Sequence, residues 1–543
     1  MATTAPPADD RAFFGHPKGL MTLFLVELWE RFSYYGMRAF LVIFISTPVA
    51  KGGLGETKAT AGIIYALYGA LVYLMSLPGG WAADRYLGQQ RAVLLGGYVI
   101  MAGHIVLAIP SHSTFYLGLG LIIIGTGFLK PNASTLVGQL YDKGDIRRDA
   151  GYSIYYMGIN IGAFFAPIAC GFLAQSATFR DALAGWGIDP NAAWHFGFGA
   201  AAVGMGLGIV TFASSRKYLG AAGRDPAPRP AVADRKPLPM LTWVVVGAAA
   251  AVTLAFGVYR AQLPYAFAMQ MVEGRPVFPI ALDKAMIADI FGVGLAAVAV
   301  AVFVIMYKVV AANRDEKNRV LAMGVLFFGC LSFFGIFEQA GSTLSFFAEE
   351  RTQKSVFGID FPSSYWQFVN AGWVILLAPV FTWLWVWLAK TGREPFSVNK
   401  FAIGMVIAGA AFVPLFFAIP TIDDGKLVSP VYLLSYYALA TCAEMCISPV
   451  GLSVMNKLAP ERLAGFVMGV WFLAISIGLY IAGRAEVEVG KVATKLEWGT
   501  GGIFYIVMIF ALVVAAILFA AAGPVRRMLN GPAPLPTARA KDA

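Results

Sequence analysis

Four charged side chains lie in one short stretch of the chain that is otherwise apolar. Glu27, Glu30, Arg31 and Arg38 fall within a mostly apolar run from about residue 20 to 44. A charged side chain at the centre of a bilayer costs about 2.5–3.5 kcal/mol on insertion scales. Ionisable residues at that depth are therefore candidate functional residues, and four of them on one predicted helix indicate a site that handles charge or protons.

The spacing of these residues brings their side chains together. At about 100° per residue in an α-helix, Glu27, Arg31, Tyr34 and Arg38 share one face, and Glu30 lies beside it. A purely structural network of ion pairs is one explanation of such a face. Two bonded ion pairs need no tyrosine beside them, however, so we favour a water-filled cavity lined by this face.

Three further charges lie in later apolar segments. Lys130 precedes Pro131, which we expect to interrupt its helix; the alternative for this lysine is to extend its ammonium group to the membrane surface. Glu338 and Glu444 lie deep in predicted spans with no base nearby in sequence. Each of these two glutamates therefore needs a partner on another helix or in a ligand.

The buried charges do not balance. Glu27, Glu30, Glu338 and Glu444 face only three bases, Arg31, Arg38 and Lys130, so one carboxylate lacks a fixed base. Such a carboxylate can take up a proton or bind a cationic group. All three bases lie in the first half of the chain and two acids in the second, which suits a zwitterionic substrate carrying an amine and a carboxylate.

The composition indicates an all-α polytopic membrane protein. Of 543 residues 58% are hydrophobic and 13% are charged, about half the charge of an ordinary soluble protein. Apolar stretches of 18 or more residues recur, each long enough to span a bilayer. Fourteen spans are predicted, at 20–48, 60–82, 91–109, 113–131, 150–174, 193–213, 240–257, 287–310, 319–348, 363–389, 399–419, 430–456, 462–482 and 502–523.

A Pro-rich basic segment, 214–239, divides these spans into six and eight. The spans 240–257 and 287–310 carry no buried charge and are predicted to be peripheral and lipid-facing. Without them, two bundles of six helices remain, the organisation of a transporter with its site between the halves. The predicted parts are an N-terminal tail, a first bundle, a linker with the two peripheral helices, a second bundle and a C-terminal tail, at 1–19, 20–213, 214–318, 319–523 and 524–543.

Lysine and arginine gather in the loops on the side of the two termini, which predicts cytoplasmic termini. The net charge of +10 is spread over short loops and forms no patch, so nucleic-acid binding is not expected. The polar first 18 residues precede no cleavable signal sequence, and we expect the first span to direct insertion. Cys442 and Cys446 have a spacing that metal ligands can use, but no further ligand lies nearby, so no metal site is predicted.

The segment G-G-W-A-A-D-R-Y-L-G-Q-Q-R (79–91) forms a predicted cytoplasmic turn. We interpret Asp84 and Arg85 within it as a conformational latch between helices. It lacks the G-K-S/T sequence and the preceding strand of a phosphate-binding loop, so ATP-driven transport is not supported.

Several segments together resemble the proton-coupled oligopeptide transporter (POT/PTR) family of the major facilitator superfamily, in its prokaryotic branch. They are the E-x-x-E-R helix (Glu27, Glu30, Arg31), G-Y-S-I-Y-Y-M-G-I-N-I-G-A (151–163), G-F-L-K-P-N, A-E-M-C-I-S-P-V-G-L-S (443–453) and V-W-F-L (470–473). The resemblance covers about 20–523. It implies two six-helix bundles plus two extra helices in the plasma (inner) membrane, and symport of di- and tripeptides with protons.

The resemblance also implies roles for individual residues. Proton coupling is implied for Glu27, Glu30, Arg31, Lys130 and Glu338, with Lys130 as the salt-bridge partner of the helix-one cluster. Arg38 and Lys130 would face the peptide carboxylate, and Glu444 would hold the amino terminus. The remaining implied substrate-binding residues are Tyr34, Tyr35, Tyr73, Asn160, Phe334, Asn370 and Trp471.

The chain departs from the family at two points. Phe334 stands where relatives often have tryptophan, so that pocket is expected to differ. No histidine occurs in the second span, where animal members carry one, and proton handling should then rest on carboxylates. Which of Glu27 and Glu30 carries the proton, the peptide preference, the proton stoichiometry and the oligomeric state stay open, although a monomer suffices for transport.

Two other functions are the alternatives to peptide symport. Related plant proteins transport nitrate or carboxylates, and the three bases would serve such an anion, but Glu338 and Glu444 would then have nothing to bind. A membrane enzyme or a channel is the second alternative. No Ser-His or metal-ligand constellation appears at membrane depth, so no catalytic residue is expected. No cofactor is expected besides protons as the coupling ion.

Overall fold

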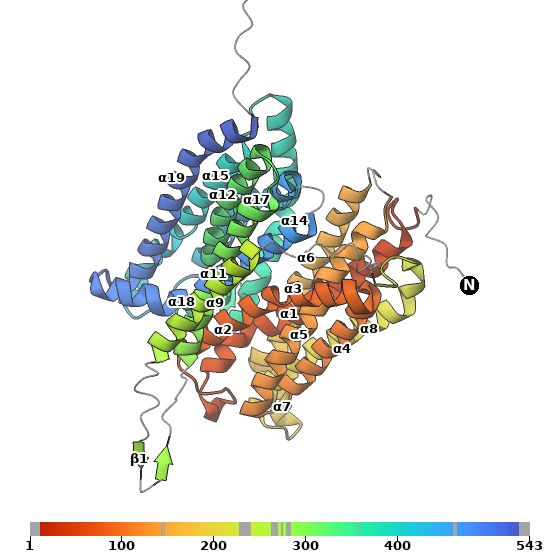
Figure 1. Ribbon diagram of the computed structural model, residues 1–543. Coiled ribbons are helices and arrows are strands. Elements are labelled where there is room, and N and C mark those ends of the chain that lie inside the picture. Colours follow the sequence, from red (N-terminus) through yellow and green to blue (C-terminus); the bar gives the residue numbers. More distant parts are fainter. Residues whose placement is uncertain are drawn as a thin grey trace, which may run out of the picture.

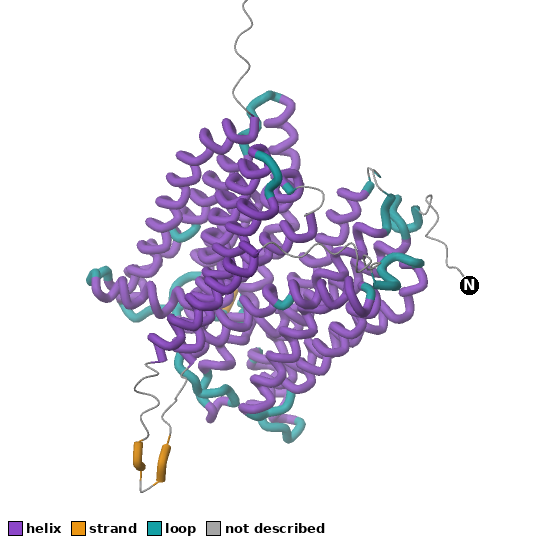
Figure 2. The backbone as a smooth tube through the Cα atoms, in the orientation of Figure 1, coloured by secondary structure: helices purple, strands orange, loops and turns teal. Residues whose placement is uncertain are grey.

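The computed structural model describes residues 11–142, 145, 147–226, 240–261, 270–272, 275–277, 284–356, 358–459 and 464–530. These residues are mostly helical (Figures 1 and 2). The predicted N-terminal tail, linker and C-terminal tail lie partly outside the described residues, at 1–10, 227–239 and 531–543. The two small sheets are hairpins, β1 (Gln270–Val272) with β2 (Arg275–Val277), and β3 (Ser355–Val356) with β4 (Ile359–Asp360).

The first bundle consists of six spans. Its helices are α1 (Lys18–Ser46), α2 (Lys58–Leu74) continued by α3 (Ser76–Ala82) and the π-helical turn η2 (Ala83–Leu87), α4 (Gln89–Leu107), α5 (His112–Gln139), α6 (Arg148–Gln175) and α8 (Ala193–Ser215). Shorter helices connect them, namely η1 (Val49–Lys51), α7 (Ala177–Gly185), η3 (Pro190–Ala192) and η4 (Arg216–Leu219).

The second bundle also has six spans, and two more helices lie before it. The extra pair is α9 (Met240–Ala261) and α11 (Lys284–Ile305) with η6 (Met306–Val310). The bundle consists of α12 (Arg314–Phe337) with η7 (Glu338–Gly341) and α13 (Thr343–Glu350), η8 (Ser363–Tyr365) with α14 (Trp366–Lys390), α15 (Ser397–Ala410) with α16 (Val413–Asp423), α17 (Pro430–Leu458), α18 (Ala464–Lys495), and η10 (Gly499–Gly501) with α19 (Gly502–Asn530).

The helices of the described residues agree approximately with the fourteen predicted spans. Among the described residues, 13 helical segments are long and apolar enough to cross a membrane. The fourteenth is α1, which has 29 residues but carries the charged cluster within its apolar run. Two helices extend well past their predicted ends: α5 continues through Pro131 to Gln139 instead of stopping at the proline, and α18 continues to Lys495 instead of ending near residue 482. A membrane helix tolerates proline where the surrounding protein accommodates the freed backbone group, which here is the Gly127 carbonyl, four residues before Pro131.

The two bundles contact each other through α2 with α18 and through α6 with α14. Ser476 Oγ on α18 donates to the Ala70 carbonyl at 2.8 Å, and Gln175 Nε2 donates to Ser363 Oγ at 3.0 Å. Lys58 Nζ and Glu350 also bridge the bundles, at 2.5 Å. Figure 1 shows the bundles meeting where α1 ends and diverging toward the end where α1 begins. A site between them is therefore closed on one side by these contacts.

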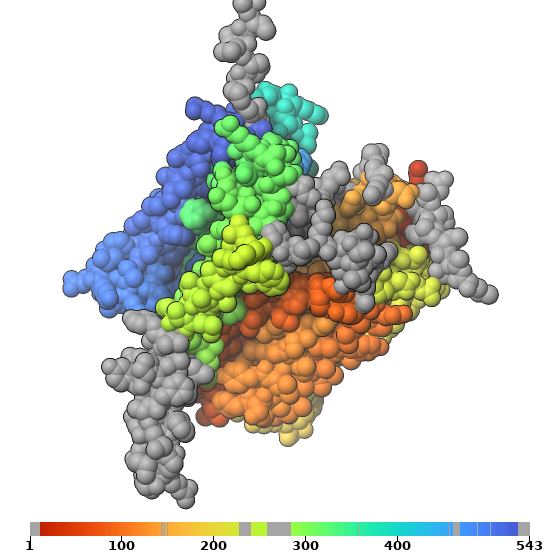
Figure 3. All heavy atoms as spheres, viewed as in Figure 1, coloured from red at the N-terminus to blue at the C-terminus, as the bar shows by residue number. Residues whose placement is uncertain are grey.

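The extra helices lie at the edge of this junction. Figure 3 shows α9, in yellow-green, on the surface between the bundles, and most of its side chains are exposed. The start of α11 contacts both bundles. Lys284 pairs with Glu56 of the first bundle, while Asp289 pairs with Arg484 of α18 at 2.9 Å. Little of either helix is buried, yet the start of α11 connects the two halves.

Candidate functional site

The charged face of α1 forms a compact, buried cluster. Glu27, Glu30 and Arg31 are each 1% exposed. Arg31 donates to Glu30 through Nε and also through Nη2, the latter at 2.5 Å from Oε1. Its Nε lies 3.5 Å from Glu27 Oε1, and Tyr155 on α6 donates its hydroxyl to Glu27 at 2.5 Å. The Arg31 guanidinium therefore pairs with two carboxylates, and the carboxylate of Glu27 also accepts a hydrogen bond from α6.

Tyrosine rings pack along this cluster. The Arg31 guanidinium lies 4.6 Å from the ring centroid of Tyr34 and 5.8 Å from that of Tyr35. Tyr68 on α2 stacks on Tyr34 with centroids 6.3 Å apart. Among the described residues the buried Tyr68 hydroxyl has no hydrogen-bond partner. The cluster thus presents cations over aromatic faces together with an uncommitted hydroxyl, which suits an interface with a polar ligand.

Arg38 joins the first bundle to the second. Its Nη2 pairs with Glu338 Oε2 at the end of α12, and its Nε donates to the Tyr65 hydroxyl at 2.9 Å. Both members of the ion pair are buried. Glu338 thus finds its base on the opposite bundle. In this state Arg38 binds that carboxylate, so its implied role toward a peptide carboxylate stays a prediction.

Lys130 is placed differently from what the resemblance implied. Its Nζ lies 3.9 Å from the ring centroid of Tyr73 and 6.0 Å from that of Phe472. Within the described part of the chain no carboxylate lies within 4 Å of it, so the implied salt bridge to Glu27 or Glu30 is not formed in this structure. Its ammonium group is held by aromatic faces and has no anionic partner within 4 Å among the residues that the structure describes.

Glu444 in α17 is the main polar group on the opposite side. It is 9% exposed, and Asn370 on α14 donates to its Oε2 at 3.2 Å and to Thr441 Oγ1 at 2.9 Å. No cation lies within 4 Å of this carboxylate among the residues that the structure describes. Asn370 and Glu444, predicted as separate contacts, thus form one hydrogen-bonded unit.

The remaining predicted residues occupy more ordinary environments. Asn160 donates to the Tyr156 carbonyl of its own helix at 3.1 Å. Trp471 is 2% exposed and packs edge-on against Phe401, and Phe334 packs against other phenylalanines of α12. Their roles in substrate binding stay predictions.

The predicted latch lies in the turn η2. Asp84 accepts a hydrogen bond from Gln89 at 2.6 Å, and the Arg85 guanidinium lies 5.6 Å from the ring centroid of Trp81. The neighbouring Gln90 accepts from Arg216 at 2.6 Å, so this turn is tied to the segment that follows α8. The latch role itself stays a prediction.

Sequence reasoning missed three tyrosines that the structure places at the charges. Tyr155 holds Glu27, Tyr65 holds Arg38, and Tyr68 stacks on Tyr34. Tyr155 lies in the segment 151–163, which was recognised only as a motif. Tyr65 and Tyr68 are three residues apart in an apolar helix, so they share a face, and that spacing was the available signal.

Two six-helix bundles with buried charges on both sides of their junction define the class of membrane transporters. Comparison with known proteins agrees with this class. Residues 90–497 match the family model described as the POT family. The chain therefore belongs to the POT family.

Relatives and solved structures extend over the whole chain. A peptide transporter of Yersinia enterocolitica is 34% identical over 540 residues, covering 98% of both chains. A di-/tripeptide transporter of Lactococcus lactis is also 34% identical and covers 96% of this chain and 98% of its own. The crystal structure of a mutant peptide transporter POT in complex with alafosfalin is 38% identical, with a TM-score of 0.77 and coverage of 96% and 98%.

Proposed function

We propose that this protein is a proton-coupled symporter that imports di- and tripeptides by alternating access. The observation that carries the proposal is the division of unpaired charge. Lys130 in the first bundle has no carboxylate within 4 Å, and Glu444 in the second has no cation, among the described residues. A short peptide has one carboxylate and one amine and so matches both groups at once. The relatives named as peptide transporters support the same substrate class.

The proton would act at the helix-one cluster. Arg31 is shared between Glu27 and Glu30, so protonating one carboxylate leaves the guanidinium to the other or to the substrate. Such a change in charge gives the differential contacts between two states that coupling requires. Proton loss on the opposite side would restore the pairing and release the peptide.

The state described here is closed on one side. Arg38–Glu338 and Lys58–Glu350 join the bundles there. We assign this side to the exterior and both termini to the cytoplasm, in the plasma (inner) membrane, in keeping with the distribution of lysine and arginine. Import would then end with release through the open side, driven by protons without ATP or catalysis, and one copy of the chain would suffice.

The experiment is uptake of labelled dialanine by purified protein in liposomes, with and without an inwardly directed proton gradient. We expect the gradient to accelerate uptake, and excess unlabelled tripeptide to compete whereas excess nitrate does not. Competition by nitrate with no effect of peptides would favour the alternative, an anion transporter. Uptake that is independent of the gradient would contradict proton coupling.

A further inference from the structure

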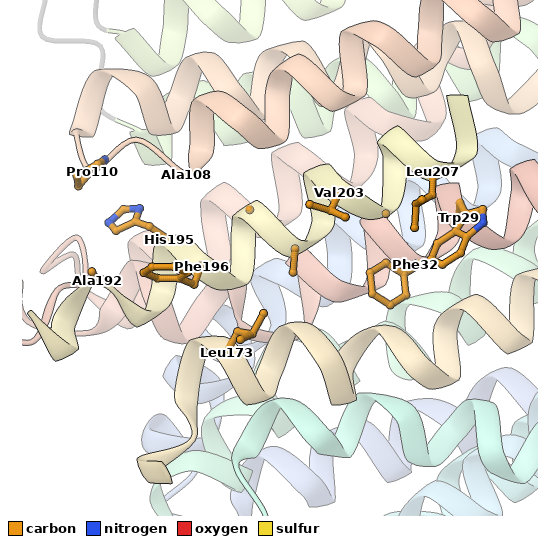
Figure 4. Close-up of a pocket in the computed structure, with 13 residues that line it drawn as sticks. Trp29, Phe32, Ala108, Pro110, Leu173, Ala192, His195, Phe196, Val203 and Leu207 are labelled. Atoms are coloured by element: carbon orange, nitrogen blue, oxygen red, sulfur yellow. The ribbon is translucent and has the colours of Figure 1, made fainter. Parts of the chain in front are cut away.

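A groove of about 770 Å³ opens on the outside of the first bundle, away from the charged face of α1 (Figure 4). α8 provides most of its lining, and α1, α6 and the end of α4 complete it. Phe196, Val203 and Leu207 line it and are 40%, 65% and 43% exposed, so it faces the surroundings of the bundle. Beside Gly199 there is open space, since a Cβ there would meet nothing within 4 Å.

The groove extends from one membrane surface toward the middle of the bilayer. Figure 4 shows its labelled side chains in a row from Ala192, near the start of α8, to Leu207 and Trp29. At 1.5 Å per residue, this part of α8 is about 22 Å long. Half of a bilayer of about 40–45 Å, head groups included, has the same length. The groove thus spans the depth of one leaflet.

The dimensions and lining determine what fits. A volume of about 770 Å³ over a length of about 22 Å describes a long, narrow groove in which one extended chain fits lengthwise. Apart from His195 near the surface end, the lining side chains are apolar, so a peptide would find no partner for its termini. If the groove were empty, the side chains that line it would lose dispersion contacts on one side. We propose that a single acyl chain of a phospholipid occupies this groove.

The site lies directly behind the charged cluster. Trp29 and Phe32 line the groove and lie roughly 140–200° round α1 from Glu27. Their rings contact each other with centroids 5.6 Å apart, and a Cβ on Gly204 of α8 would collide with Phe32. The acyl chain therefore packs against the back of the helix segment that carries Glu27, Glu30 and Arg31. This binding site does not depend on which substrate the protein transports.

The test uses a photoreactive lipid. The full-length protein is reconstituted in phosphatidylcholine vesicles that contain a diazirine-bearing acyl chain, then solubilised in detergent so that loosely held lipids exchange, irradiated and mapped by mass spectrometry. We expect adducts on Trp29, Phe32 and Leu207. Gly199→Trp, which fills the groove, should reduce these adducts at least fivefold. The matched control is Gly247→Trp on α9, where a Cβ also meets nothing, and it should leave the groove adducts unchanged.

Irradiation before solubilisation gives an internal standard, because Leu254 on α9 is 70% exposed and should be labelled equally in every variant. Ala200→Leu is a milder second variant and should reduce the groove adducts in the same direction. The proposal is overturned if groove adducts are absent after detergent exchange, or if both groove variants leave them unchanged. Cross-links at Val203 between two copies of the chain would equally overturn it, since they would show that another protomer covers the groove.

Discussion

Arg38 on α1 and Glu338 at the end of α12 form a buried ion pair that connects the two bundles, and the Tyr65 hydroxyl on α2 accepts a further hydrogen bond from Arg38 Nε. The pair couples the charged face of α1 to the position of the second bundle. Any event that removes the charge of Glu338 therefore weakens the closed side of the transporter.

The first prediction concerns this closure. Removing one partner of a buried ion pair costs about 3–5 kcal/mol, whereas an exposed pair is worth about 0–1 kcal/mol. Glu338→Gln should therefore shift the population strongly toward opening on that side. Glu350→Gln, which removes the exposed interbundle pair with Lys58, is the matched control and should shift it far less. Spin labels at Val49 and Ile359, both exposed, would report the distance between the bundles. Equal distance distributions in all three proteins would contradict the prediction.

Glu444 predicts a preference for peptides with a free amino terminus. A hydrogen bond to a charged group contributes about 1.5–3 kcal/mol, which corresponds to a factor of roughly 10–150 in affinity. Wild-type protein should therefore bind dialanine at least tenfold more tightly than N-acetyl-dialanine, measured by competition against labelled substrate. Glu444→Gln should bring the two affinities close together. If the variant kept the full discrimination, the amine would have to bind elsewhere.

The extra helices α9 and α11 should weakly favour the closed state on the side that the Arg38–Glu338 pair closes. Lys284 at the start of α11 pairs with Glu56 of the first bundle, and both side chains are partly exposed. Lys284→Gln is expected to favour opening on that side by up to about fivefold, the equivalent of roughly 1 kcal/mol. Lys308→Gln, at the opposite end of the α11 segment, is the control and should leave the interbundle distance unchanged. A shift of the same size in both variants would exclude a specific role of the Lys284–Glu56 pair.

A pH effect is expected at the start of the described chain. His16 Nδ1 lies 2.9 Å from the Tyr141 hydroxyl, and burial, together with Arg147, lowers the pKa of His16 below 6.5 while Asp145 opposes the shift. The neutral ring is thus favoured in the packed segment. The neutral His16 ring therefore stabilises the packed segment above pH 6.5. This stabilisation is lost as the pH falls below that value toward the lowered pKa of His16.

The hydrogen–deuterium exchange rate of residues 11–17, corrected for intrinsic rates, should therefore increase when the pH is lowered from 7.5 to 5.5. In His16→Gln the corrected exchange should no longer depend on pH. An identical pH response in wild type and variant would show that another group titrates.

Apolar length was enough to predict which segments of the chain form the long helices. The charged cluster on α1 was also predictable, because residues three and four apart must share a helix face. The contacts between side chains of different helices could not be predicted from the sequence. Nothing in the sequence pairs Arg38 with Glu338, 300 residues away, or brings Tyr155 to Glu27. The helix boundary at Pro131 was misjudged for the same reason, since neighbouring groups decide whether a membrane helix tolerates a proline.

The charge count also needs refinement. Four acids and three bases predicted one carboxylate without a base, and Glu27 or Glu30 was expected to be that residue. In the structure Arg31 serves both of them, Arg38 serves Glu338, and Glu444 has only an amide and no cation within 4 Å in the described part of the chain. Lys130 and Glu444, which have no oppositely charged partner within 4 Å among the described residues, thus lie on opposite bundles. That separation depends on the tertiary structure and could not be counted from the sequence.

The α1 cluster of Glu27, Glu30 and Arg31 should couple proton movement to peptide transport. The most direct measurement compares gradient-driven uptake and counterflow exchange of labelled dialanine in liposomes for wild type, Glu27→Gln and Glu30→Gln. If the cluster couples the two, driven uptake should fall at least tenfold in the variant that lacks the proton-carrying carboxylate, while counterflow exchange survives. Driven uptake at the wild-type rate in both variants would contradict the account.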